Sequence, residues 1–260
     1  MRELVAACLQ LRVVPGNVDA NLANAREGIE ELASGKCRLV VLPEMWACGF
    51  PYSRLQDVAS RTPEVVEEMR GWARRHGMVL VGSLPESVDG RVYNTSYVID
   101  ANGEIAGSYR KVHLFSLHHE DLHFGRGETS LVCSTEAGEL GVMICYDLRF
   151  PELGRKLALD GARIMCVSSH WPDIRIDHWS LLLRARAVEN QLFVIGCNGC
   201  GTEKKMRYGG ASAIISPMGK ALIEAGTGPE SIAAALDMEE VDRFRKLITC
   251  FPDRVPAVYE

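Results

Sequence analysis

The sequence predicts an α/β fold built in layers, with strands that run in both directions. Amphipathic helical patterns alternate along the chain with short, continuously apolar runs, which is typical of helices packed on buried strands. Two strand-like segments, 92–100 and 104–111, are joined by the turn residues ANG, and this predicts an antiparallel pair. No linker, low-complexity tract or internal repeat interrupts the sequence, so we expect one domain over residues 1–260.

The helices are expected where apolar residues recur at helical spacing. Residues 21–35 show this pattern up to a final glycine, and residues 62–77 show it with Thr62 as the cap and Pro63 at the first helical position. Each of these helices leads directly into an apolar run. The expected further helices are 150–162, 177–191 and 239–249, and the expected buried strands are 37–44, 78–86, 139–145, 162–170 and 192–198.

The C-terminal part contains closely spaced strand-like segments in place of alternating helices and strands. Residues 209–217, 220–226 and 231–237 are strand-like and lie close together in the sequence, separated only by short turns. We expect three consecutive antiparallel strands here.

Composition excludes several classes of protein. The formal net charge is −5 with acidic and basic residues interspersed, so no basic stripe for nucleic acid is present. No run reaches the roughly 18 apolar residues that a membrane-spanning helix needs, and the N-terminal residues lack the layout of a cleavable signal. The nine cysteines are scattered through apolar runs, which suits reduced core thiols. We therefore expect a cytoplasmic protein without nucleic-acid or membrane partners.

The stretch HHEDLHF, residues 118–124, contains HEDLH, which matches a zinc-peptidase signature. In that signature His119 and His123 would share one helix face and bind zinc, and Glu120 would activate water. The flanking sequence favours a loop, because a strand-like segment precedes the motif and FGRGETS would end any helix within about two turns. No later segment offers a clear third ligand. A zinc hydrolase stays the alternative, and the expectation is no metal and no cofactor.

Cys197 and Cys200 form the motif CNGC, which in other contexts is a redox pair or half of a zinc site. Here it leads into a glycine-rich polar loop and no second such motif exists. We expect a plain loop.

Three residues with reactive side chains follow expected strands. Glu44 ends VVLPE, Lys111 follows AGSYR, and Cys145 ends GVMIC just before a helix. Side chains at strand ends converge on one crevice in such folds. A lysine ammonium favours the thiolate and stabilises an oxyanion, and a carboxylate can take the thiol proton and return it to a leaving amine. Together they predict acyl transfer through a thioester.

The segments VVLPEMWACGF, YRKVHLF and GVMICYDLRFPEL occur in the order and spacing of the nitrilase superfamily of carbon–nitrogen hydrolases. The resemblance extends to HWPDIRIDHWSLLLRARAVENQ and YGGASAIISPMGK, and so covers nearly the whole chain. It implies an αββα sandwich of two mixed sheets, with Cys145 as nucleophile, Glu44 as general base and Lys111 as stabiliser of the transition state. It also implies a second glutamate after the lysine, for which Glu120 is the candidate and Asp121 the competitor.

The RFPEL and WPDIRIDHW segments resemble most the omega-amidase branch, which hydrolyses the terminal amide of short dicarboxylic monoamides such as 2-oxoglutaramate. Such a substrate keeps a carboxylate, and an arginine is the side chain best suited to bind it. Arg175 and Arg149 are the candidates. Further candidate substrate-binding residues are Tyr146, Trp171 and Phe124.

The alternatives within the superfamily are a nitrilase and an N-carbamoyl amidohydrolase, and a non-catalytic binding protein is a further alternative. By analogy with the family we expect a homodimer or a larger homo-oligomer.

Overall fold

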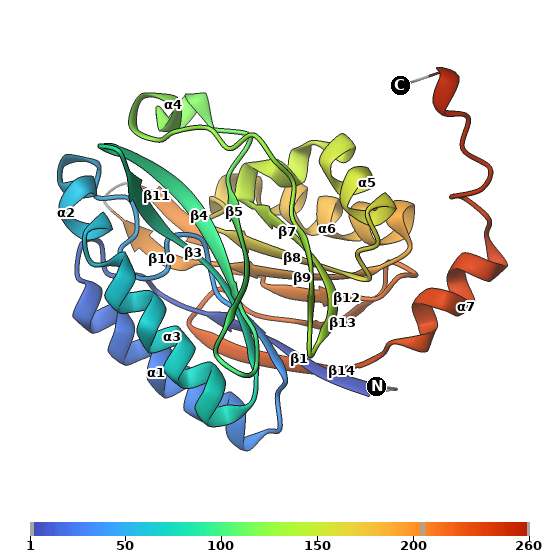
Figure 1. Cartoon of the computed structure of the whole chain (residues 1–260), viewed down its shortest axis with the longest axis horizontal. Coiled ribbons are helices and arrows are strands. Elements are labelled where there is room, and N and C mark those ends of the chain that lie inside the picture. Colours follow the sequence, from blue (N-terminus) through green and yellow to red (C-terminus); the bar gives the residue numbers. More distant parts are fainter. Residues whose placement is uncertain (1–2, 204–205, 259–260) are drawn as a thin grey trace.

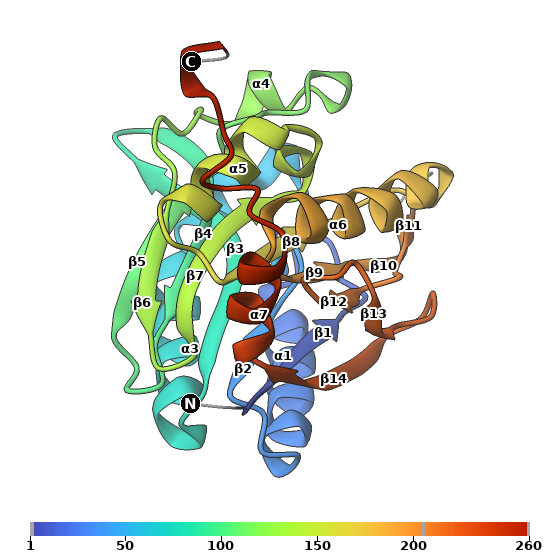
Figure 2. The ribbon, with the colours of Figure 1, turned by 90° about the vertical axis from the view of Figure 1, so that its right-hand side faces the viewer.

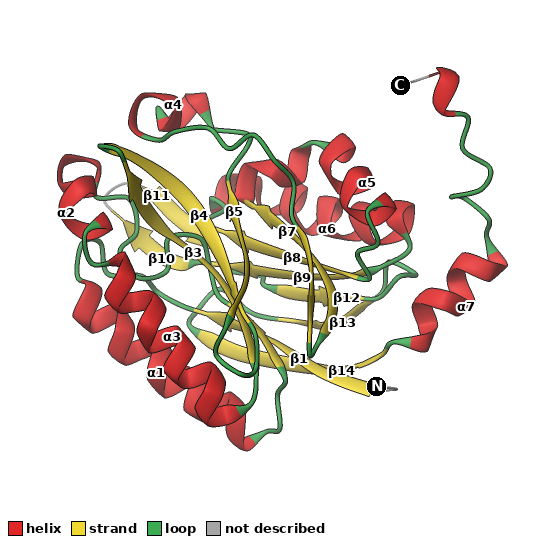
Figure 3. Ribbon diagram, in the orientation of Figure 1, coloured by secondary structure: helices red, strands yellow, loops and turns green. Residues whose placement is uncertain are grey.

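The computed structural model describes residues 3–203 and 206–258, and within them two six-stranded mixed sheets pack face to face (Figure 1). Helices cover the outer face of each sheet, as the colouring by secondary structure makes visible (Figure 3). The expected αββα sandwich is confirmed.

The first sheet has the strand order β14-β1-β2-β3-β4-β5. Its central strands β1, β2 and β3 run parallel, whereas β14, β4 and β5 join as antiparallel neighbours. The helices α1 and α3 cover its outer face, with the short helix α2 before α3 (Figure 1). The bounds are β1 Glu3–Gln10, β2 Leu39–Val41, β3 Val79–Val88, β4 Arg91–Ile99, β5 Ile105–Arg110, β14 Glu230–Asp237, α1 Val18–Ser34, α2 Leu55–Ala59 and α3 Thr62–His76.

The second sheet has the order β13-β12-β9-β8-β7-β6 and is covered by α5 and α6 (Figure 2). Strands β7, β8 and β9 are parallel. A separate hairpin, β10–β11, follows β9. The bounds are β6 Val132–Thr135, β7 Gly138–Ile144, β8 Ile164–Ser169, β9 Phe193–Asn198, β10 Cys200–Glu203, β11 Met206–Gly209, β12 Ala213–Ile215, β13 Ala221–Glu224, α4 Glu120–His123, α5 Pro151–Leu159, α6 Ile176–Asn190 and α7 Glu239–Leu247.

Burial on both faces explains why the central strands are continuously apolar. In β2, Leu39 and Val41 pack in the core shared with the second sheet, while Val40 between them packs in the cluster under α1 and α3. Successive side chains of a strand point to opposite faces, so a strand covered on both sides needs apolar residues at every position. Each such side chain contributes about 1.5–3 kcal/mol when fully buried.

The edge where β2, β7 and β8 end is the place where the two sheets are joined by polar contacts. The backbone N–H of Glu44, just after β2, donates to the carbonyl of Ser169 at the end of β8 (3.3 Å). The backbone N–H of His170 donates in turn to the Glu44 carboxylate (3.1 Å). These contacts fix the loop after β2 relative to the second sheet.

Two expectations about the elements need correction. Strand β14 pairs with β1 in the first sheet and does not follow β13 in the second. Helix α3 is preceded by Arg61 at the cap position, and the Thr62 hydroxyl donates to the Pro85 carbonyl (2.5 Å) instead of capping the helix. Strands β1, β6, β10 and β11 were not expected from the sequence.

Among the described residues, no helix is both long enough and apolar enough to span a membrane.

Candidate active site

Cys145 lies where β7 passes into a 3-10 turn, Cys145–Arg149, and it has a positive φ of 46°. A non-glycine residue in this region of φ is strained and persists only where its surroundings hold it. Asp147 supplies that restraint. Its carboxylate is buried and accepts hydrogen bonds from the backbone N–H of Ile144 (3.0 Å) and the hydroxyl of Tyr109 (2.8 Å). The turn is therefore a fixed platform that presents the thiol at the sheet edge.

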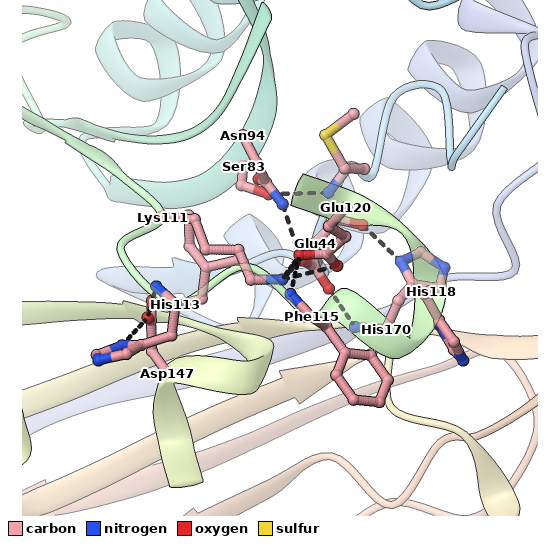
Figure 4. Close-up of polar contacts among 12 residues, drawn as sticks. Glu44, Ser83, Asn94, Lys111, His113, Phe115, His118, Glu120, Asp147 and His170 are labelled. Carbon is pink, nitrogen blue, oxygen red and sulfur yellow. Dashed lines mark hydrogen bonds and ion pairs between the residues drawn. The ribbon is translucent and has the colours of Figure 1, made fainter. Parts of the chain in front are cut away.

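The Glu44 carboxylate is buried and accepts hydrogen bonds on both oxygens (Figure 4). Oε1 accepts from Lys111 Nζ (2.8 Å) and from the side-chain amide of Asn94 (2.8 Å), and Oε2 accepts from the backbone N–H of His170 (3.1 Å). These donors come from β4 and from the residues that directly follow β5 and β8. Cys145 lines the same cavity as Glu44.

Lys111 is fully buried and lies between two carboxylates (Figure 4). Besides Glu44, its Nζ contacts Glu120 Oε1 (2.9 Å) and Oε2 (2.8 Å). Glu120 is held by the backbone N–H of Phe115, which donates to Oε2 (2.9 Å). An ammonium has three protons, so one remains for a further acceptor after each carboxylate has received one.

The electrostatics of this cluster set the resting protonation states. Burial alone would raise the pKa of Glu44, but the charge and hydrogen bond of Lys111 outweigh it and hold that pKa below the ordinary value of a glutamate. Burial, followed by the charge of Glu44, raises the pKa of the Cys145 thiol well above its usual range. The pKa of Lys111 is also raised, because the charges of Glu120 and Glu44 exceed the effect of burial. At neutral pH the site therefore holds a thiol, an ionised Glu44 and a charged lysine.

A cavity of about 430 Å³ opens over Cys145. Its floor includes Glu44 and Cys145, and its walls are largely aromatic. The wall residues are Phe50, Tyr52, Phe115, Leu117, His118, His119, Glu120, Tyr146, Arg149, His170, Trp171, Pro172, Arg175, Glu203, Met206 and Tyr208.

Two arginines at the cavity wall are positioned by aromatic rings. The Arg149 guanidinium lies 4.7 Å from the ring centre of Trp171, and that of Arg175 lies 5.7 Å from Phe115. Within residues 3–203 and 206–258, neither arginine takes part in any of the ion pairs that the structure shows. The wall therefore offers positive charge that no carboxylate of the described chain neutralises.

The predicted site residues fall into three groups. Glu44, Lys111, Glu120 and Cys145 come together, and Arg149, Arg175, Tyr146 and Trp171 line the same cavity. Phe124 does not line it. This ring is buried behind the wall, with its centre 6.4 Å from that of Phe50 and 6.2 Å from that of Tyr52. Phe124 thus supports the wall residues, and its prediction as a direct substrate contact is corrected.

The HEDLH motif does not form the helix that zinc binding would require. Helix α4 is a single turn that begins after His119, which itself has a positive φ of 58°. His123 stacks on Tyr52 with ring centres 4.1 Å apart, and Glu120 is committed to Lys111. Among the described residues, no group of three or more His, Cys, Asp or Glu side chains is arranged to hold a metal ion.

The two cysteines of the CNGC motif, Cys197 and Cys200, are both buried thiols, on β9 and β10.

The sequence reasoning missed several polar residues around Glu44. Asn94 donates to its carboxylate, and His170 contacts it through the backbone and also through ring Nδ1, which lies 2.6 Å from the Glu44 carbonyl oxygen. Because a carbonyl only accepts, Nδ1 carries the proton, and burial lowers the pKa of this histidine. The sequence gives little signal for Asn94, because its strand β4, RVYNTSYVI, also contains Arg91, Thr95 and Ser96.

A buried glutamate and lysine beside a partly exposed cysteine, at the joined edge of two mixed sheets, define a cysteine hydrolase of the αββα class. The chain belongs to the carbon–nitrogen hydrolase family, whose model matches residues 5–246. This confirms the resemblance to the nitrilase superfamily.

Named relatives are similar over almost the whole chain. The 2-oxoglutaramate amidase of Bacillus subtilis (strain 168) is 35% identical over 249 residues, which cover 95% of this chain and 96% of that protein. The omega-amidase NIT3 of Saccharomyces cerevisiae is 33% identical over 279 residues, covering 99% and 95%. The crystal structure of Saccharomyces cerevisiae Nit3, a member of branch 10 of the nitrilase superfamily, has a TM-score of 0.89 at 32% identity, with 97% of both chains covered. An amidase from Nesterenkonia sp. AN1, solved with an acetamide moiety added to its active-site cysteine, has a TM-score of 0.88 at 27% identity, covering 98% of this chain and 95% of that one.

Proposed function

We propose that the protein hydrolyses the terminal amide of a short dicarboxylic acid monoamide and releases ammonia, which is the omega-amidase type of reaction. The observation that carries this is that Cys145 and Glu44 line one cavity together with Arg149 and Arg175, while the buried ammonium of Lys111 contacts Glu44. The names of the bacterial and yeast relatives, 2-oxoglutaramate amidase and omega-amidase, support it.

The first half-reaction forms a thioester. The Cys145 thiol is neutral at rest, so Glu44 takes its proton as the sulfur attacks the amide carbonyl. Negative charge then develops on the carbonyl oxygen, and the remaining proton of Lys111 Nζ faces it in a site with little water. Glu44 gives the proton to the departing nitrogen. The carbon–nitrogen bond breaks, ammonia leaves, and the acyl group stays on Cys145.

The second half-reaction hydrolyses the thioester and regenerates the free enzyme. A water molecule takes the place of ammonia, and Glu44 removes one of its protons as the oxygen attacks the thioester carbonyl. The carbon–sulfur bond breaks, the carboxylic acid product leaves, and the proton returns from Glu44 to the Cys145 sulfur. Glu120 contacts neither the sulfur nor the reacting carbon in this scheme. It holds the ammonium of Lys111 in place.

The far end of the substrate is expected to meet the arginines. A guanidinium can bind a carboxylate through two parallel N–H bonds, and Arg149 and Arg175 are already oriented by stacking. The Arg175 charge is also among the causes, after burial, that lower the pKa of the neighbouring His118, so this histidine is neutral at pH 7. It can then accept or donate a hydrogen bond beside the bound carboxylate.

The test is ammonia release from 2-oxoglutaramate, succinamate, glutamine, a nitrile and a carbamoyl amino acid, each with and without chelator. We expect release from the first two compounds, unchanged by chelator and lost in Cys145→Ala. Cys250→Ala, which changes an exposed free cysteine outside the cavity, serves as the matched control and should keep full activity. Preference for the nitrile or the carbamoyl compound would move the protein to another branch. Activity that chelator removes would favour the zinc hydrolase.

Two further proposals concern the oligomeric state and the cellular location of the protein. We propose a homodimer, which light scattering coupled to size-exclusion chromatography tests directly. We also propose a reducing, cytoplasmic location, which the nine free cysteines support, and fractionation of the source cells is the test.

A further inference from the structure

A tyrosine in the cavity wall joins the two segments that supply the buried carboxylates of the site. Tyr52 lies in the segment between β2 and α2, and Glu44 lies earlier in the same segment. Glu120 belongs to residues 118–123, which we call the Glu120 turn and which includes α4. Tyr52 is partly buried and lines the same cavity as both glutamates.

Tyr52 contacts the Glu120 turn at both of its ends. At the start of the turn, the Tyr52 hydroxyl donates to the His118 carbonyl oxygen (3.2 Å). At its end, the Tyr52 ring stacks on the ring of His123, with the centres 4.1 Å apart and the planes 8° from parallel. The next residue, Phe124, is buried and meets the same ring edge to face, at 6.2 Å. One side chain therefore holds the turn from outside.

The Glu120 turn has little support of its own. Helix α4 is a single turn, and a helix this short is marginal without external contacts. His119, just before it, has a positive φ of 58°, a conformation that persists only where the surroundings hold it. The large apolar side chains in and beside the turn, Leu117 and Leu122, are exposed and do not anchor it in the core. Contacts from other segments must therefore keep the turn in place.

The position of the turn matters because of what Glu120 contacts. Both of its carboxylate oxygens lie within 2.9 Å of the Lys111 ammonium, on the other side of which is Glu44 (Figure 4). A small shift of the turn would move one of these counter-charges away from the ammonium, and small displacements in an active site lower the rate strongly. The Tyr52 hydroxyl remains a donor, because burial, followed by the charges of Glu120 and Glu44, raises the pKa of Tyr52 well above its usual range.

We propose that Tyr52 is a positioning residue for Glu120: by holding both ends of the Glu120 turn, it keeps the carboxylate against Lys111. In this role Tyr52 acts through the glutamate and does not touch the reacting atoms. The inference rests on the proposed function only where turnover is measured, because the hold on the turn is a property of the folded protein without substrate.

Hydrogen exchange followed by mass spectrometry of peptides over residues 115–124 tests the hold on the turn. The amide hydrogens of Glu120, Leu122 and Phe124 donate to carbonyl oxygens within this segment, so opening of the turn exposes them. We expect Tyr52→Leu, which removes both the hydroxyl and the ring, to speed exchange in these peptides about tenfold. Tyr52→Phe keeps the ring and should speed it by about threefold.

Tyr97→Leu is the matched control. Tyr97 on β4 is also partly buried and packs against the same hydrophobic cluster as Tyr52, but it is not among the residues that line the cavity. This variant should leave exchange over 115–124 unchanged. His123→Phe keeps a ring that can stack on Tyr52 and should resemble the parent, whereas His123→Ala should speed exchange.

Turnover then shows whether the hold acts through Glu120. Tyr52→Leu should lower kcat about tenfold in the parent protein, but should change it little in a Glu120→Gln background, where the contact with Lys111 is already weakened. Residues that act through one another show such non-additive effects. An equal loss of kcat in both backgrounds would mean that Tyr52 acts on the substrate directly, and this would overturn the proposal.

Unchanged exchange over 115–124 in Tyr52→Leu would also overturn it, and so would equally fast exchange in Tyr97→Leu. Faster exchange confined to the Tyr52 and His123→Ala variants would support it. If the parent released ammonia from none of the amides, the proposed function would fail, while the exchange experiment would still decide whether Tyr52 holds the turn.

Discussion

Glu120 contacts the ammonium of Lys111 through both of its carboxylate oxygens, at 2.9 and 2.8 Å, and both residues are buried. The glutamate comes from a single helical turn nine positions after the lysine. The contact therefore couples the shape of the loop over the cavity to the position of the charge beneath it. A loop that moves away takes one of the two counter-charges with it.

Glu120→Gln should lower kcat by about a hundredfold, the loss typical of a weakened electrostatic contact in an active site. An amide oxygen at the Oε2 position can still accept from Lys111 and the Phe115 N–H, but the amide has no negative charge and its NH₂ group would take the place of Oε1 beside the ammonium. Steady-state ammonia release measures the effect. Asp121→Asn, at the exposed neighbouring position, is the control and should change kcat little. Similar losses in both variants would show that the loop matters as a whole and Glu120 does not.

Arg175→Gln should raise KM for a monoamide that carries a carboxylate by about tenfold or more, because a charge-assisted bond of about 1.5–3 kcal/mol is removed. A neutral amide of similar length should be turned over as before. The same comparison with Arg149→Gln shows how the two arginines share the task. Arg207→Gln is the control, since Arg207 is exposed and already lies 3.5 Å from Asp173. Equal effects on charged and neutral amides would contradict carboxylate binding by these residues.

Gly127→Ala should destabilise the fold by about 1–3 kcal/mol, the range for overpacking a buried position. Its new Cβ would clash with the Arg110 carbonyl oxygen, and the Gly127 N–H donates to the Lys111 carbonyl, so relief of the clash displaces Lys111. Urea unfolding and kcat should both report the change.

Gly71→Ala is the matched control for Gly127→Ala. It lies in α3 with nothing within 4 Å of the added atom, and it should stabilise the protein by about 0.5–1 kcal/mol. A normal kcat in Gly127→Ala would show that the lysine does not depend on this contact.

The acid limb of kcat/KM should lie below the range in which an ordinary glutamate titrates, because Lys111 outweighs burial and lowers the pKa of Glu44. A carboxylate with a lowered pKa is ionised above it and loses its function only as pH falls through it. A neutral amide should be used, so that the substrate does not titrate, and samples returned to pH 7 reveal any unfolding.

Asn94→Ala removes a donor to Glu44 and should move this limb to higher pH. Asn24→Ala, on the exposed face of α1, is the control and should leave the acid limb unchanged. An acid limb near neutral pH in the parent protein would contradict an ionised Glu44 in the resting enzyme.

The central strands and their helices were predictable because burial on both faces leaves an unbroken apolar run, as in β2, β3, β8 and β9. Glu44 and Cys145 were predictable as strand-end residues because each follows such a run, whereas Lys111 was predictable because it follows the second strand of a recognisable hairpin. The pairing of β14 was not predictable, because its sequence suits an edge of either sheet. Which sheet it joins depends on which edge is near in space. The short strands of the β10–β11 hairpin carry too little pattern to be recognised.

The cavity wall was harder to predict than its floor. Trp171 and Phe124 are both aromatic residues next to predicted site residues, but only the conformation of the loops decides that Trp171 lines the cavity and Phe124 does not. Asn94 was not predictable, because β4 alternates polar and apolar residues and only the packing of the strand buries this one.

The pairing of β1 with β14 brings together segments from opposite ends of the chain, with Glu3 opposite Asp237 and Gln10 opposite Glu230. Strand β1 must therefore wait until β14 has been synthesised before its outer edge is covered. Contacts of such long sequence separation slow folding, and an open strand edge invites pairing with other chains in the meantime. The same arrangement makes a truncation before residue 230 costly for the first sheet, although every residue of the Glu44, Lys111 and Cys145 cluster would still be present.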